Sequence, residues 1–243
     1  MTFCKKHQSS DTNVRCSRCE DFICTNCMVP ASIGYQCPSC ASDSTPIIKG
    51  INRTRFIPSQ KNTQVTKLIS ISLLVVYVFQ FLIGDVLIAN FALFAPSVTN
   101  GQWWLLITAG FLHGSIIHLL FNIYILRVLG SQLENIVGKT KFIIIYFGSL
   151  LGGSLASYLF SPFGSYSIGA SGAIFGLMGA MLVVGRKRNL DISQITTLVV
   201  INVVIGFVLS GIDWRAHLGG LAAGALITWI LINATSLKGK NQR

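Results

Sequence analysis

Five long runs without a charged side chain constrain the fold of this chain more than any other feature. They are residues 68–84, 86–126, 142–185, 192–212 and 216–237. About 20 helical residues cross a hydrocarbon core of roughly 30 Å, so the second and third runs are each too long for one crossing. Turn-forming segments that contain Pro and Gly divide these two runs at residues 95–101 and 161–165. We therefore predict an all-α polytopic membrane protein with six crossing helices, at residues 68–88, 104–128, 142–160, 168–185, 194–211 and 216–235.

The composition excludes an ordinary water-soluble enzyme, because 51% of the residues are hydrophobic and only 11% are charged. Charge is concentrated near the N-terminus, where residues 1–67 hold nine Lys or Arg and four Asp or Glu. A net charge of +11 would also suit nucleic-acid binding. Most basic side chains, however, lie beside the apolar runs, where anionic lipid headgroups and membrane orientation account for them. We expect membrane lipids as partners and no nucleic acid.

The distribution of Lys and Arg also predicts the orientation of the helices. If the N-terminus is cytosolic and six helices cross the membrane, 18 of the 19 basic residues lie inside, and only Arg215 lies outside. We therefore expect an integral, multi-pass protein with both termini in the cytosol. Residues 236–243 would form a basic cytosolic tail, and the membrane would be a bacterial plasma membrane.

All seven cysteines precede residue 41, and together with His7 they form four pairs whose partners are separated by two residues. The pairs are Cys4 and His7, Cys16 and Cys19, Cys24 and Cys27, and Cys37 and Cys40. Such a spacer lets both side chains reach one ion at about 2.0–2.3 Å, and four sulfur or nitrogen ligands satisfy Zn²⁺. No apolar signal segment precedes the cysteines, so we expect a reducing cytosol, which disfavours disulfides. The eight ligands predict two structural zinc ions.

The cysteine-rich region has few large apolar side chains, so metal is expected to fold it. We predict a zinc-stabilised domain at residues 1–40, a basic flexible linker at residues 41–67 and a membrane domain at residues 68–235. A closed four-ligand zinc site has no open position for catalysis. The small domain therefore indicates binding or regulation, with a possible cytosolic partner.

The ligand spacing resembles that of a B-box-type zinc finger, which implies a cross-braced pairing. One ion would be held by Cys4, His7, Cys24 and Cys27, and the other by Cys16, Cys19, Cys37 and Cys40. The last pair departs from the B-box pattern, which usually has histidine there.

Three of the expected helices carry polar side chains at corresponding depths. His113, His118 and Asn122 fall early in residues 104–128, Ser171 begins residues 168–185, and His217 begins residues 216–235. Because these helices run in the same direction, their polar groups share the outer half of the membrane, where such groups are costly and usually functional. Glycines follow both Ser171 and His217 at four-residue spacing, which lets two helices approach closely.

These residues resemble three ordered motifs of the rhomboid family of intramembrane serine proteases, over about residues 66–235. The matching segments are FLHGSIIHLLFN with His113, His118 and Asn122, GASG with Ser171, and AHLGG with His217. The resemblance implies a six-helix bundle that cleaves transmembrane protein substrates near the outer face and needs no cofactor for catalysis. Ser171 would be the nucleophile and His217 its general base.

The same resemblance implies supporting roles for five further residues. His118, Asn122 and the backbone near Gly169 and Ser171 would form the oxyanion hole, Phe175 would stack on the catalytic histidine, and His113 would bond a loop near the outer interface. Glu134 would have a structural hydrogen-bonding role, and no carboxylate would complete a triad.

Two other functions are compatible with parts of the pattern. A catalytically inactive relative would bind membrane helices without cutting them, although the presence of both Ser171 and His217 favours the protease. A small transporter would also have six crossings, but the sequence has no repeated half-helix and no charged pathway. The HExxH motif of a zinc metalloprotease is absent from the sequence.

Overall fold

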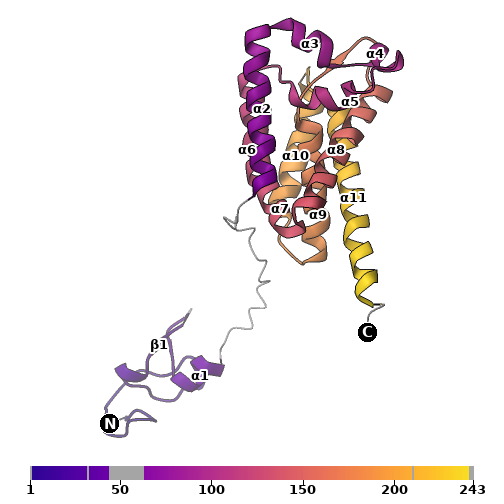
Figure 1. The fold of residues 1–243 in the computed structure, drawn as a ribbon. Coiled ribbons are helices and arrows are strands. Elements are labelled where there is room, and N and C mark those ends of the chain that lie inside the picture. The colour runs from indigo at the N-terminus through magenta and orange to yellow at the C-terminus, as the bar shows by residue number, and fades with distance from the viewer. Residues whose placement is uncertain (1, 32, 44–62, 210, 241–243) are drawn as a thin grey trace. The chain divides into compact units, whose positions relative to one another are not determined.

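The structure is a computed structural model that describes residues 2–31, 33–43, 63–209 and 211–240. The chain divides into two compact units, Met1–Arg53 and Thr54–Arg243, which are described separately (Figure 1). Most of the expected linker, residues 44–62, lies outside the described residues. Its two ends are helical: α1 (Pro38–Asp43) includes residues 41–43, and α2 (Gln64–Ile83) begins four residues earlier than expected.

The first unit has little regular structure. It contains the one-turn helix η1 (Thr25–Cys27), helix α1 and an antiparallel pair of two-residue strands, β1 (Val29–Pro30) and β2 (Tyr35–Gln36). Its buried core consists of five cysteines and one large apolar side chain, Ile23. Such a core is too small to hold the unit together by apolar burial alone.

The second unit is mainly helical, and its long helices lie side by side (Figure 1). After α2, the helices are α3 (Asp85–Phe91), α4 (Ala95–Thr99), α5 (Leu105–Thr108), η2 (Ala109–Phe111), α6 (Ile116–Ile125), the π-helical turn η3 (Leu126–Gly130), α7 (Ser131–Val137), α8 (Lys139–Phe160), α9 (Ser171–Lys187), α10 (Ser193–Val208) and α11 (Trp214–Lys240). Two short strands, β3 (Leu93–Phe94) and β4 (Tyr166–Ser167), pair antiparallel and join the loops before α4 and α9.

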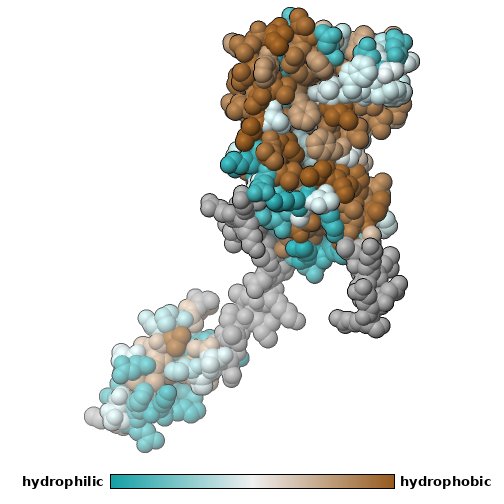
Figure 2. All heavy atoms as spheres, in the orientation of Figure 1, coloured by the Kyte–Doolittle hydropathy of each residue, from teal (hydrophilic) through white to brown (hydrophobic). Residues whose placement is uncertain are grey.

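Four helices among the described residues are long and apolar enough to cross a membrane. They are Gln64–Ile83, Ile116–Val137, Lys139–Phe160 and Trp214–Ala234. Helix α10 is apolar but shorter, and α9 has 17 residues, of which twelve are buried inside the unit. Apolar side chains cover much of the face in Figure 2, and hydrophilic side chains gather near its ends. The structure is thus that of a mostly helical membrane protein, while the count of six crossings stays a prediction.

The second expected helix, at residues 104–128, is placed wrongly. Residues 105–111 form only the short helices α5 and η2, and the long helix begins at Ile116 and continues to Val137. Ser115 is the reason for the start, because its Oγ accepts the N–H of His118 at 3.1 Å and so caps the helix. His113 therefore lies in the preceding loop.

Glu134 lies in the part of that helix beyond the expected end. Its side chain is buried, and its carboxylate accepts hydrogen bonds from the N–H groups of Val65 and Thr66 at 3.1 and 2.9 Å and from the Thr66 hydroxyl at 2.7 Å. These N–H groups belong to the first turn of α2, where they have no acceptor within the helix. Glu134 thus has the expected structural role, and it joins α7 to the start of α2.

Candidate active site and metal-binding clusters

Ser171 and His217 meet at the ends of two adjacent helices. Ser171 is the first residue of α9, and His217 lies in the first turn of α11. The Oγ of Ser171 is 2.9 Å from Nε2 of His217, within hydrogen-bond distance. A neutral imidazole that accepts this bond at Nε2 carries its proton on Nδ1. The pair is therefore arranged for transfer of the serine proton to the histidine.

Glycines allow α9 and α11 to approach closely enough for this contact. A Cβ atom added at Gly220 would lie 1.9 Å from the carbonyl oxygen of Gly172, and one added at Gly224 would lie 2.1 Å from that of Gly176. These distances are far below van der Waals contact, so no larger residue fits without moving a helix. The small-residue faces expected from the sequence are in contact.

Phe175 fixes the plane of the histidine ring. Its ring lies parallel to that of His217, with centroids 4.1 Å apart and an interplanar angle of 12°. Phe175 is on α9, one helical turn after Ser171, so the same helix positions the serine and supports the histidine.

Among the described residues, no carboxylate forms a hydrogen bond with the His217 ring. Nδ1 of His217 is buried and has no hydrogen-bond partner among the described residues. The nearest acid in sequence, Asp213, directs its carboxylate to Ser157, Ser167 and the N–H of Ala216 instead. The arrangement is a Ser–His pair without a third acidic member. No motif in the sequence predicts these contacts of Asp213.

Gly169 brings the loop before α9 against the His118 ring. Its φ is +126°, and an added Cβ would lie 2.8 Å from Cε1 of His118, so glycine is required on both counts. The N–H of Gly169 donates to the carbonyl of Ala109 at 2.9 Å. Because this N–H already has an acceptor, it is not available to an oxyanion hole, which revises its expected role. The first N–H groups of α9, beginning at Ser171, lack helical acceptors.

His118 and Asn122 lie one turn apart on α6. The side-chain amide of Asn122 is buried and donates to the carbonyl of His118 at 3.0 Å. The Cβ added at Gly169 would lie 3.1 Å from Nε2 of His118 and 3.8 Å from Oγ of Ser171, so the His118 ring and the serine hydroxyl both lie close to Gly169. Both side chains belong to the same corner of the unit as the Ser–His pair.

The backbone of His113 is hydrogen-bonded by Gln80, a residue that belongs to none of the motifs in the sequence. The side-chain amide of Gln80, on α2, donates to the His113 carbonyl at 2.6 Å and accepts its N–H at 3.1 Å. The His113 ring packs edge-on against that of His118, with centroids 5.0 Å apart. Burial, with a smaller contribution from His118, lowers the pKa of His113 to about 4. The backbone of His113 thus ties the loop before α6 to α2.

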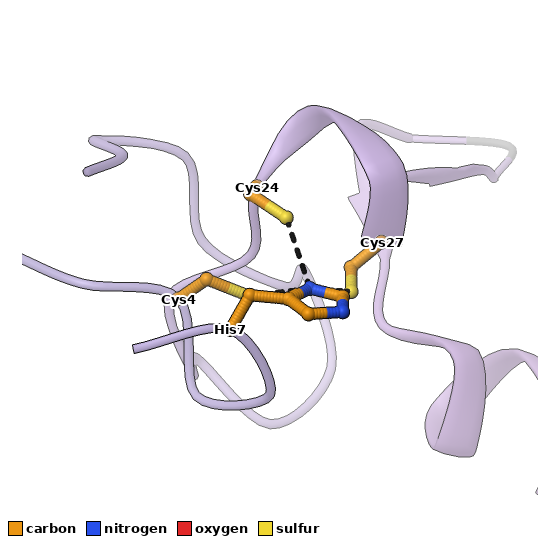
Figure 3. Close-up of side chains that lie close together, drawn as sticks. All are labelled: Cys4, His7, Cys24 and Cys27. Carbon is orange, nitrogen blue, oxygen red and sulfur yellow. Dashed lines mark hydrogen bonds between the residues drawn. The ribbon is translucent and has the colours of Figure 1, made fainter. Parts of the chain in front are cut away.

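The first unit gathers the eight expected metal ligands into two sets of four. They are Cys4, His7, Cys24 and Cys27, and Cys16, Cys19, Cys37 and Cys40, with the ligand atoms of each set within 4.8 Å of one another. Figure 3 shows the His7 ring among the three sulfur atoms of the first set. The Sγ atoms of Cys24 and Cys27 are each 3.3 Å from Nδ1 of His7, and that of Cys4 is 3.9 Å away.

These distances fit a tetrahedral metal site. Ligands bound at about 2.0–2.3 Å in a tetrahedron are separated by roughly 3.5 Å. In the second set, the sulfur atoms of Cys19 and Cys37 are 3.8 Å apart, whereas a disulfide requires about 2.05 Å. All seven cysteines are free. The N–H groups of Cys37 and Cys40 also point at sulfur, which favours thiolates.

Known proteins match the second unit. Residues 100–234 match the family described as the Rhomboid domain, which is more than half of the chain. The chain is 39% identical over 140 residues to "Putative rhomboid protease YdcA" of Bacillus subtilis, covering 56% of this chain and 70% of the relative. It is 42% identical over 132 residues to "Rhomboid protease GluP" of the same organism, covering 52% of this chain and 26% of the relative.

A plant protein matches over a similar part of the chain. "RHOMBOID-like protein 4" of Arabidopsis thaliana is 35% identical over 153 residues, covering 60% of this chain and 38% of the relative. The match to the Rhomboid domain includes Ser171, His217 and the helices that bring them together, and it excludes the cysteine-rich unit. By the match over its helical unit, this chain belongs to the rhomboid family.

Proposed function

We propose that this protein is an intramembrane serine endopeptidase that cleaves transmembrane segments of other membrane proteins near the outer face of the membrane. The observation that carries the proposal is the 2.9 Å contact between Oγ of Ser171 and Nε2 of His217. Such a contact is the minimum required for a histidine to activate a serine nucleophile. The rhomboid family supports membrane proteins as the substrate class.

In the proposed reaction, Oγ of Ser171 attacks the carbonyl carbon of the scissile peptide bond while Nε2 of His217 takes its proton. The protonated histidine then donates this proton to the leaving amine, and an acyl-enzyme remains on Ser171. Water, deprotonated by His217, hydrolyses the ester and restores the serine. No metal or other cofactor takes part in these steps.

The polar groups beside the pair would stabilise the oxyanion formed during attack. We assign this role to His118, Asn122 and the N–H groups at the start of α9, because donors directed at the developing charge are usually the largest electrostatic contribution in acyl transfer. Phe175 would support the His217 ring, and His113 and Gly169 would shape the loops around this ring.

The substrate must expose a peptide bond that a helix normally hides. Segments with small or helix-breaking residues at the cleavage site unwind at the lowest cost, so we propose these as preferred substrates. The distribution of basic residues supports an active site on the outer side of the membrane and both termini in the cytosol, and we propose a bacterial plasma membrane as the location.

We further propose that the cysteine-rich unit holds two structural Zn²⁺ ions and binds a cytosolic partner. The ligand chemistry and the distances between the donor atoms in each set of four support zinc. Bound zinc would supply folding free energy, because the apolar core of this unit is small.

The test of the proteolytic function uses the full chain in detergent as wild type, Ser171→Ala and His217→Ala. Each is treated with a fluorescent fluorophosphonate and with a model single-pass substrate. Ser165→Ala is the matched control, since this hydroxyl lies on the loop before α9 and donates only to the Pro162 carbonyl. We expect labelling and cleavage by the wild type and the control alone. A folded wild type that neither labels nor cleaves would favour an inactive relative that binds membrane helices.

A further inference from the structure

The carboxylate of Asp213 connects three elements around the Ser–His pair. One oxygen, Oδ1, accepts the N–H of Ala216 at 3.1 Å and so caps the start of α11. The other, Oδ2, accepts the hydroxyl of Ser167 at 2.6 Å and also that of Ser157. Ser157 is near the end of α8, and Ser167 is in β4. Asp213 therefore joins the histidine helix to α8 and to the loop that leads to Ser171.

Only three residues separate Ser167 from the nucleophile. On its other side this loop is fixed to the rest of the unit, because β4 pairs with β3 and the N–H of Gly169 bonds to Ala109. The hydrogen bond between the side chains of Ser167 and Asp213 links this loop to the beginning of α11. It relates the position of Ser171 to that of His217 independently of the packing between α9 and α11.

The contacts of Asp213 are hydrogen bonds rather than ion pairs. Among the residues that the structure describes, no Lys or Arg pairs with its carboxylate, and the neighbouring Arg215 lies over the Trp214 ring. Hydrogen bonds to an ionised carboxylate are about twice as strong as those between neutral groups and fix the donors more tightly. The carboxylate of Asp213, with its three donors, therefore holds α8, β4 and the start of α11 together.

We propose that Asp213 is a positioning residue for the reaction: through Ser167 and Ala216 it sets the distance between Oγ of Ser171 and Nε2 of His217. This inference rests on the proposed proteolytic function. It differs from the role of a triad acid, because Asp213 does not bond the His217 ring, whose Nδ1 lacks a partner among the described residues. Asp213 acts on the backbone that carries the pair.

Ser167→Ala tests this role with little risk to folding. The variant keeps the cap on α11 and the bond to Ser157, and it removes only the link from Asp213 to the loop. Fluorophosphonate titration gives the number of active sites, and the labelling rate and kcat are then expressed per titrated site. Because a displacement of about 1 Å can reduce a rate by roughly 100-fold, we expect both quantities to fall by on the order of ten-fold, with KM changed less than about two-fold.

Two further variants complete the experiment. Ser165→Ala should label and cleave as the wild type, since it does not contact Asp213. Asp213→Asn should preserve the start of α11, because asparagine caps helices as well as aspartate does, but should still lower the rate per site.

The outcomes separate positioning from a merely structural role. A Ser167→Ala protein with fewer titrated sites but an unchanged rate per site would overturn the proposal, because only folding would then depend on the link. A Ser167→Ala protein with the same rate per site and the same number of titrated sites as the wild type would also overturn the proposal. An inactive wild type would overturn the proteolytic function and this inference together, whereas an active wild type with an unaffected Ser167→Ala overturns this inference alone.

Discussion

The rings of Phe175 and His217 are stacked in parallel, with centroids 4.1 Å apart, while Nε2 of the same histidine faces Ser171. Rotation of the imidazole out of this plane would move Nε2 away from the serine. Aromatic pairs contribute about 0.5–1.5 kcal/mol beyond their apolar burial. The stack is therefore strong enough to select one orientation of the ring.

We predict that Phe175→Leu lowers kcat by roughly two- to ten-fold, the range that about 0.5–1.5 kcal/mol implies, while Phe175→Tyr keeps most of the activity. The measurement is the cleavage rate of a model substrate per site titrated with fluorophosphonate. Phe175→Tyr is the matched control, because it retains the aromatic ring. Equal rates for the leucine and tyrosine variants would show that stacking does not position the base.

The contact between α9 and α11 gives a second prediction. A Cβ at Gly220 would lie 1.9 Å from the Gly172 carbonyl oxygen, so Gly220→Ala must push the two helices apart. Overpacking typically costs about 1–3 kcal/mol. We expect a lower midpoint of thermal unfolding in detergent and loss of most cleavage, because the serine and histidine separate.

Gly114→Ala is the matched control for that substitution. Its added Cβ would make an ordinary contact of 3.9 Å with Cδ1 of Ile168, and its backbone does not require glycine. Cleavage and thermal unfolding should stay close to those of the wild type. If Gly220→Ala were as active and as stable as Gly114→Ala, the close helix contact would not exist.

The motifs in the sequence predict that Ser171 and His217 come together, and their side chains lie 2.9 Å apart in the structure. The two sets of four metal ligands are also those that the resemblance implied. In both cases the order and spacing of the residues match the pattern of a known family, and this pattern also relates residues that are far apart in the sequence, such as Ser171 and His217.

Contacts between distant segments that belong to no known motif could not be predicted from the sequence. Gln80 and His113 are 33 residues apart, and Ser157 and Asp213 are 56 apart, with no shared motif. Charged residues also do not mark the end of the helix that begins at Ile116: the expected end followed Arg127, but the helix continues to Val137 and includes the buried Glu134, whose carboxylate accepts hydrogen bonds from α2. A charge marks the end of a crossing only when no partner within the protein satisfies it.

Glu134 gives a third prediction. It accepts two N–H groups at the start of α2, and a buried donor left without an acceptor costs about 1–3 kcal/mol. Glu134→Ala should therefore lower the midpoint of thermal unfolding by several degrees, without a large change in kcat at low temperature. Gln132→Leu is the control, because its Oε1 is buried without a hydrogen-bond partner among the described residues. A Glu134→Ala protein as stable as this control would contradict the structural role.

The cysteine-rich unit gives the last prediction. The purified full chain should contain two zinc ions, and Cys24→Ser should retain one, because Cys24 belongs to only one of the two sets. Elemental analysis measures the metal, and thiol titration of the denatured protein without reductant should find seven free cysteines. Ser42→Ala, outside both sets, should keep two ions.

Removal of the metal should unfold the first unit and leave proteolysis largely intact. Zinc binding provides on the order of 10 kcal/mol or more in zinc-finger peptides, far more than the small core of this unit supplies. A chelator should therefore make the chain before residue 44 sensitive to proteases, while cleavage of a model substrate in detergent stays within about two-fold. Ser171 and His217 lie in the helical unit, which has its own core. A parallel loss of cleavage on chelation would mean that the two units are coupled, and fewer than seven free thiols would mean that disulfides hold the first unit.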